Sequence, residues 1–208
     1  CTLRSDFAGA VRTPTAFASA VRKNPLRVLA MDRQELEEAI ERPARQLGHP
    51  LPSALIESLV AQVEGRAGAL PLLEFALKQL WVDHIAGNLD EEQSSSRLIE
   101  DFLVQAADAL FETAGDTEQK RMVAQRIIYR AFVSMVQLGE GTPDTRRVAR
   151  LSEFVCPEDD PKHVRTVLAA FTAPEARLVT ASEQDDEPTY ELAHEALITS
   201  WGRFASWL

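Results

Sequence analysis

Apolar residues recur at helical spacing along most of the chain, and short breaks separate the helical segments. This i, i+3, i+4 pattern predicts helices over residues 35–47, 53–63, 68–81, 97–114, 117–135 and 161–173. The polar stretch 86–96, which contains a run of three serines, is predicted to be a linker. The pattern therefore predicts a mainly helical protein.

Capping residues and prolines mark several of the predicted helix ends. Asp32 with Glu35 fits an acidic variant of the capping box, and Asp160 followed by Pro161 is typical of a helix start. Pro43 falls inside the first helical pattern, where we expect it to kink the helix or to end its first half.

The hydrophobic period changes from helical to alternating near the C-terminus. Residues 177–182 and 189–193 alternate on either side of the acidic stretch 183–188, which predicts a β-hairpin with an acidic tip, and 146–151 is predicted to be a short strand or extended piece. The final pattern predicts one amphipathic helix with an apolar stripe of Leu197, Trp201, Phe204 and Leu208. Helix, helix, short strand, helix, hairpin, helix is the order of a winged-helix domain.

Composition narrows the class of protein. A formal net charge of -10 and a pI of about 4.9 disfavour a nucleic-acid-binding or membrane-binding surface, and no apolar run approaches the length of a membrane span. Cys1 and Cys156 give neither a disulfide framework nor zinc-ligand spacing, so a cytoplasmic location is expected. Because residues 1–4 resemble the end of a strand, we expect the chain to be part of a longer protein.

Several catalytic motifs are absent from the sequence. There is no phosphate-binding loop, so the chain is not expected to hold a triphosphate alone, and His194-Glu195 has isoleucine where a zinc protease has its second histidine. The other histidines lack ligand spacing, and adjacent acidic pairs are interpreted as solvated charge. A self-contained catalytic site and a metal site are therefore not expected.

Two residues have both a structural and a functional interpretation. His194 lies where the alternating strand meets the last helix, and a helix start attracts anions such as phosphate, but a histidine there is more often a capping or packing residue. Pro71 fits the first turn of its helix, where its missing N–H costs nothing, and its ring could also form one wall of a slot for a planar base.

Five segments resemble, in chain order, motifs of the bacterial STAND NTPases that often carry C-terminal β-propeller repeats. They are residues 3–7, 35–43, 68–77, 145–147 and 193–201. The resemblance implies that 1–25 ends an NTPase core with its sensor strand, that 26–96 is a helical lid domain, and that 97–208 is a winged-helix domain. The implied fold class is mainly α, a helical lid bundle followed by a winged-helix domain with a small β-hairpin.

The resemblance also implies three nucleotide contacts. Arg4 corresponds to a sensor arginine near the terminal phosphate, Pro71 to the Gly-x-Pro proline that packs on adenine, and His194 to the winged-helix histidine that contacts the diphosphate. The chain departs from related regulators at Ala69, where they have glycine, and at 193–195, which is Ala-His-Glu where they have Met-His-Asp. The implied cofactor is ATP or ADP, with Mg²⁺ bound by the preceding core.

Three functions remain open on the sequence. The first is the regulatory portion of a signalling ATPase, which holds an ADP-bound resting state until ATP exchange opens the domains for assembly. Its partners would be the preceding NTPase core, C-terminal sensor repeats and further copies of itself, with no nucleic acid and no membrane. The second is a DNA-binding winged-helix regulator, although the predicted hairpin tip is acidic.

The third function is a passive helical interaction module. Arg146, Arg147 and Arg150 form a basic patch that could dock an acidic partner surface or could simply neutralise the nearby acidic helices.

Overall fold

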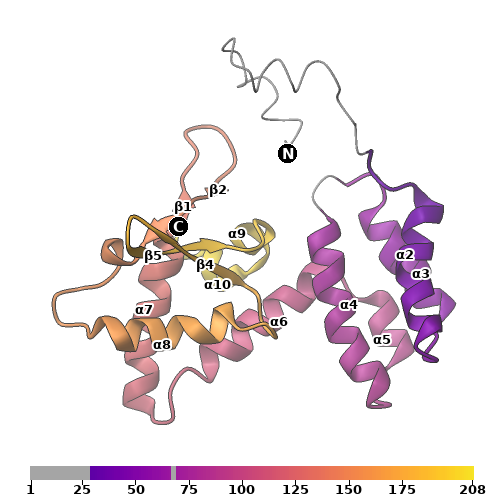
Figure 1. The fold of residues 1–208 in the computed structure, drawn as a ribbon, viewed down its shortest axis with the longest axis horizontal. Coiled ribbons are helices and arrows are strands. Elements are labelled where there is room, and N and C mark those ends of the chain that lie inside the picture. The colour runs from indigo at the N-terminus through magenta and orange to yellow at the C-terminus, as the bar shows by residue number, and fades with distance from the viewer. Residues whose placement is uncertain (1–28, 67–68) are drawn as a thin grey trace. The chain divides into compact units, whose positions relative to one another are not determined.

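The structure, a computed structural model, describes residues 29–66 and 69–208 (Figure 1). The chain divides into two units, Cys1–Met31 and Asp32–Leu208, and the second contains the elements discussed below. Within the described residues, none of the helices has both the length and the apolar character needed to cross a membrane.

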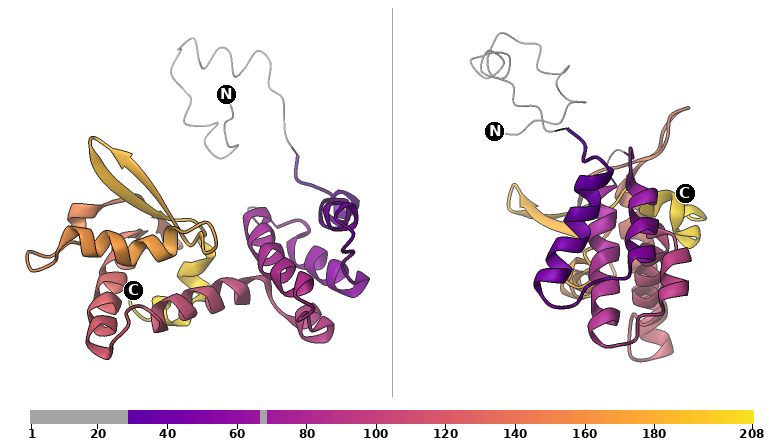
Figure 2. Two further views of the ribbon diagram at one scale, coloured as in Figure 1. Left: turned by 60° about the horizontal axis from the view of Figure 1, so that its bottom comes forward. Right: turned by 90° about the vertical axis from the view of Figure 1, so that its right-hand side faces the viewer.

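The second unit is mainly helical, with two small antiparallel sheets near its C-terminal end (Figures 1 and 2). In chain order its elements are α2 (Arg33–Gln46), α3 (Ser53–Val63), α4 (Leu70–Ile85), α5 (Glu91–Ser96), α6 (Ile99–Glu112), α7 (Glu118–Ser134), β1 (Val136–Gln137), β2 (Thr145–Arg146), β3 (Ala149–Arg150), η2 (Leu151–Glu153), α8 (Pro161–Thr172), β4 (Val179–Gln184), β5 (Glu187–Leu192), α9 (Ala196–Ser200) and α10 (Gly202–Ala205). The predicted mainly α fold with a small β-hairpin is confirmed.

Helix α2 begins at the predicted capping box. The Asp32 carboxylate accepts from the Glu35 backbone N–H at 2.9 Å, and the Glu35 carboxylate accepts from the Asp32 N–H at 3.0 Å. The expectation that Pro43 could end the first half of this helix is wrong, because α2 continues through it to Gln46. Pro43 itself is exposed, while Ile40 and Ala44 on either side are buried, so core packing holds both halves of the helix together.

The polar stretch 86–96, which was predicted to be a linker, contains the helix α5. Side chains of α3 bind the backbone at its C-terminal end: Ser58 donates to the Ser95 carbonyl, and the Gln62 amide donates to the carbonyl of Arg97, the residue after α5, at 3.0 Å. The Gln62 carbonyl oxygen also accepts from the Ile99 N–H at 2.8 Å, at the start of α6. Polar side-chain contacts fix this segment, which an apolar pattern cannot reveal.

Aromatic packing joins α7, α8 and the C-terminal segment. The Phe132 ring of α7 is fully buried and meets the rings of Phe171, Trp201 and Phe204 edge to face, with centroids 5.2–5.5 Å apart. One continuous core of buried apolar residues extends from α2 to α10 through these contacts.

The two sheets are small and antiparallel. Strands β1 and β2 pair alone, and the second sheet has the order β3-β5-β4, with Val179 opposite Leu192 and Gln184 opposite Glu187. The turn between β4 and β5 contains only Asp185 and Asp186, both at positive φ. The strands therefore extend further into the acidic stretch than the alternation predicted, and a two-residue turn of the I′ kind closes the hairpin.

The prediction of one continuous C-terminal helix is wrong. Trp201 adopts an extended backbone conformation that separates α9 from α10. Its indole N–H donates to the Asp108 carboxylate of α6 at 2.8 Å, while its ring is fully buried. Tertiary packing of this one side chain therefore overrides the helical pattern. The domain boundaries at 25 and 96 and the winged-helix assignment stay predictions.

Replacing Phe132 with alanine should lower the free energy of unfolding by about 3–5 kcal/mol, because it removes a fully buried ring from the aromatic core. The measurement is urea denaturation of the chain. Met122, which lies on the same helix and is 48% exposed, provides the control: its change to alanine should stay within about 0.5 kcal/mol. Equal losses in the two variants would contradict the packing argument.

Candidate functional site

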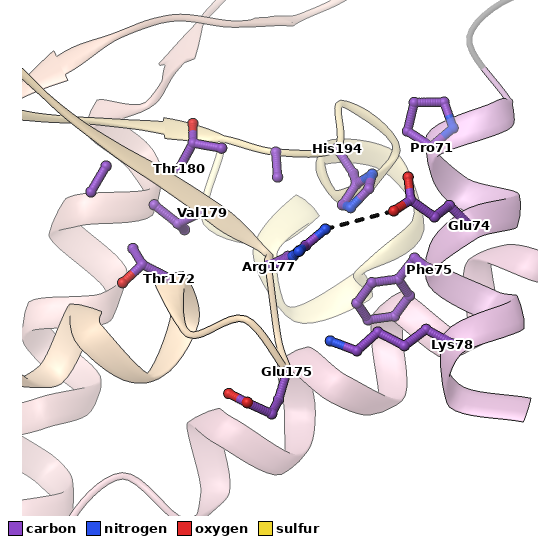
Figure 3. Close-up of a pocket in the computed structure, with 12 residues that line it drawn as sticks. Pro71, Glu74, Phe75, Lys78, Thr172, Glu175, Arg177, Val179, Thr180 and His194 are labelled. Carbon is purple, nitrogen blue, oxygen red and sulfur yellow. Dashed lines mark ion pairs between the residues drawn. The ribbon is translucent and has the colours of Figure 1, made fainter. Parts of the chain in front are cut away.

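A cavity of about 590 Å³ lies between one face of α4 and two later segments, the start of β4 and the end of β5 (Figure 3). Its lining combines apolar side chains with groups of both charges. The residues around it are Pro71, Glu74, Phe75, Lys78, Thr172, Glu175, Arg177, Val179, Thr180, Ala181, Ala193 and His194.

Helix α4 contributes Pro71, Glu74, Phe75 and Lys78, which recur at helical spacing and therefore share one face. Pro71 occupies the first turn of α4, as its structural interpretation predicted, and it also lines the cavity. The Pro71 ring is exposed and can form one wall of the cavity, whereas the Phe75 ring is buried.

Arg177 reaches the cavity from the connection between α8 and β4. Its guanidinium forms an ion pair with the Glu74 carboxylate at 3.6 Å, across to α4 (Figure 3). A second link joins the same two segments, because the Lys78 ammonium donates to the Pro174 carbonyl. Both links are exposed, so their contribution to the free energy of unfolding is small.

His194 lies between the end of β5 and α9 and is 9% exposed. Its imidazole packs edge to face on the Phe75 ring of α4, with the centroids 5.6 Å apart. The expected long helix after His194 is instead the five-residue α9. The position of the imidazole is thus determined by α4 and the cavity wall, and a helix dipole has little part in it.

The surroundings of His194 keep its imidazole neutral at pH 7. Burial lowers its pKa from the usual 6.5, and the nearby positive charge of Arg146 lowers it further. The Glu74 carboxylate and a backbone hydrogen bond with Arg177 act in the opposite direction but are smaller effects. The ring therefore lines the cavity as a neutral group, and an anion bound nearby would raise its pKa and favour its protonation.

Arg146 holds the chain immediately before His194. Its guanidinium donates to the carbonyls of Leu192 and Ala193 at 3.0 and 3.3 Å, and pairs with Glu191 at 3.5 Å. The end of β5 is thereby tied to β2, which fixes the direction in which the chain presents the imidazole.

The other two arginines of the basic patch are also paired within the chain. Arg147 binds Glu153 at 2.6 Å, and Arg150 binds the hairpin acids Asp185 and Glu187 at 2.7 and 3.5 Å. The patch is therefore neutralised within the chain, as one interpretation predicted. The acids involved, however, lie in η2 and the hairpin and not in the acidic α-helices that this interpretation named.

Two of the three predicted nucleotide contacts thus line one cavity, although Pro71 and His194 are far apart in sequence. The third, Arg4, lies outside the described residues. Sequence reasoning missed Glu74, Lys78 and Arg177. The first two could have been found from their helical spacing to Pro71, whereas nothing in the local sequence marks Arg177.

The described part of the chain contains no group of three or more histidine, cysteine or acidic side chains placed to hold a metal ion. The cavity combines apolar rings with two cationic side chains, two carboxylates and an imidazole able to donate a hydrogen bond.

Stability should depend on pH through His194. Because its folded-state pKa is below the unfolded value near 6.5, the folded state binds fewer protons, and stability falls as pH drops through that value. The slope from this group is at most about 1.4 kcal/mol per pH unit. Denaturation of the chain between pH 5 and 8 should show a shallower pH dependence for His194→Gln than for the wild type. Parallel curves would contradict this assignment.

Comparison with known proteins supplies the family. No curated protein and no solved structure gives a significant match to the sequence. The sequence profile of the family described as Novel STAND NTPase 1, in contrast, matches residues 1–208. The chain therefore belongs to the Novel STAND NTPase 1 family.

Proposed function

We propose that this chain is the regulatory portion of a STAND signalling ATPase. It contributes adenine and phosphate contacts to a nucleotide and holds an ADP-bound resting state until ATP exchange opens the domains for assembly. A preceding NTPase core would supply the phosphate-binding loop and the Mg²⁺ site, because the chain has no such loop. The chain itself would bind and not catalyse.

The observation that carries this proposal is the shared cavity of Pro71 and His194. The two residues come from segments that the resemblance to STAND NTPases singled out separately, one for the base and one for the diphosphate. The cavity meets the different needs of these two groups, because its rings suit a planar base and its basic side chains suit a phosphate.

A nucleotide in this position would act as a link between α4 and the β5–α9 connection. A ligand biases two arrangements of a protein only by the difference between its contacts in each. An imidazole on one segment and a proline on another satisfy this condition, since a ligand that touches both is held best when the segments are close. Loss of one contact would weaken the resting arrangement.

His194→Ala in the full-length protein should weaken ADP binding by about tenfold to a hundredfold, because a hydrogen bond to a charged phosphate contributes about 1.5–3 kcal/mol. Isothermal titration with ADP provides the measurement. His163→Ala, at an exposed position of α8, is the matched control and should leave the affinity unchanged. Unchanged ADP affinity in the His194 variant would remove the basis of the proposal.

A DNA-binding role is the alternative from another class, and we expect no salt-sensitive binding to duplex DNA. Helix α8 has exposed Lys162 and Arg165, but Asp185 and Glu187 at the hairpin tip are acidic and already engage Arg150. A gel-shift titration with random duplex DNA at two salt concentrations checks this. A robust shift that weakens with salt would reverse the order of the two functions.

A further inference from the structure

We infer that Arg177 binds a phosphate oxygen of a nucleoside diphosphate in the cavity, and that Glu74 is its internal competitor for that guanidinium. The inference rests on the proposed function and adds to it, because it assigns two residues that the family resemblance does not. It follows from the backbone of Arg177, the position of Glu74, and the balance of charge around the cavity.

The backbone of Arg177 is in an unfavourable conformation. Its φ of 44° is in the left-handed region, where the described non-glycine residues otherwise include only Asp185 and Asp186 of the hairpin turn. Aspartate in such a turn is ordinary, whereas arginine lacks the short polar side chain that makes the left-handed region easier to adopt. Strained residues of this kind concentrate at ligand sites.

Neighbouring hydrogen bonds hold this conformation in place. The Arg177 N–H donates to the Ala173 carbonyl at 2.9 Å, and the next N–H, of Leu178, donates to the Phe171 carbonyl at 3.0 Å. The Leu178 carbonyl then accepts from Ala193 at 2.9 Å, next to His194. The strained turn therefore brings the base of the Arg177 side chain and the imidazole to the same wall of the cavity.

Glu74 lies where an anion would interact with both groups. Its carboxylate pairs with Arg177 at 3.6 Å, and its charge acts on the imidazole of His194 (Figure 3). The pair is loose, with side chains 63% and 76% exposed for Arg177 and Glu74 respectively. A diphosphate carries more charge than a carboxylate, and a guanidinium can bind a phosphate through two parallel hydrogen bonds, so it should displace Glu74 from its loose pair.

The remaining charges around the cavity favour one multiply charged ligand. Lys78 lies one helical turn beyond Glu74 on α4, and Glu175 lines the cavity from the α8–β4 connection. The two acids and two bases balance each other, so an anion gains little unless a carboxylate moves away. A diphosphate has enough charge to do this, and a base attached to it would use the apolar rings of Pro71 and Phe75.

The first test removes the competitor. Glu74→Gln in the full-length protein should bind ADP about threefold to tenfold more tightly, because an exposed ion pair contributes up to about 1 kcal/mol, and repulsion of the phosphate is lost as well. Asp83→Asn, an exposed acid farther along α4, is the matched control and should leave the affinity unchanged. Unchanged or weaker binding by Glu74→Gln would overturn its role as a competitor.

The second test separates binding from folding at Arg177. Glycine tolerates the left-handed backbone, so Arg177→Gly should keep or raise the thermal unfolding midpoint while weakening ADP binding about tenfold. Arg177→Gln should weaken binding equally and retains the strain. Arg203→Gln, on α10 outside the cavity, is the charge control. Wild-type affinity in both Arg177 variants would overturn the assignment of this residue.

Failure of this inference can be distinguished from failure of the proposed function. If His194→Ala loses ADP affinity while the Glu74 and Arg177 variants bind as the wild type does, the cavity binds the nucleotide but these two residues have no part in it. If all the variants bind ADP as the wild type does, the cavity is not the nucleotide site. Tighter binding by Glu74→Gln with weaker binding by both Arg177 variants is the expected result.

Discussion

The structure around the candidate site depends on the packing of His194 against Phe75. This contact joins a polar imidazole at the end of β5 to a buried ring of α4, with the centroids 5.6 Å apart. Burial keeps the imidazole neutral, which lets it occupy an apolar boundary without the large free-energy cost of a buried charge. The same position leaves it at the cavity wall, where an anion can raise its pKa again. The His194 side chain thus packs against α4 and can also gain a positive charge when an anion lies nearby.

The predicted helices followed from apolar periodicity, and the errors occurred where other forces determine the structure. Ser58 binds the backbone of α5, and Gln62 binds the backbone between α5 and α6, so hydrogen bonds hold a polar segment that was predicted to be a linker and that contains a helix. Trp201 breaks the final helix because its indole binds Asp108 while its ring fills the core. Neither interaction leaves a periodic trace in the sequence. In both cases tertiary contacts overrode the local pattern.

The site was predictable to the extent that its residues belong to recognisable motifs. Pro71 and His194 were identified from their segments, and the structure places them at one cavity. Arg177 escaped notice because what distinguishes it is a backbone angle, which depends on the turn between α8 and β4. Arg146 was noticed only as part of a basic patch, whereas its contacts with the carbonyls before His194 show a positioning role. Sequence patterns indicate which segments matter, but the geometry of turns decides which side chains meet.

The distribution of strong and weak contacts bears on how such a site could switch. The aromatic core around Phe132, which does not line the cavity, is fully buried and would resist change. Across the cavity, α4 meets the α8–β4 connection through Glu74 with Arg177 and Lys78 with Pro174, both exposed links. Exposed pairs contribute little to stability, so a ligand of moderate affinity can alter their balance. A buried core beside a weakly linked cavity would therefore allow a nucleotide bound as proposed to change local contacts without unfolding the protein.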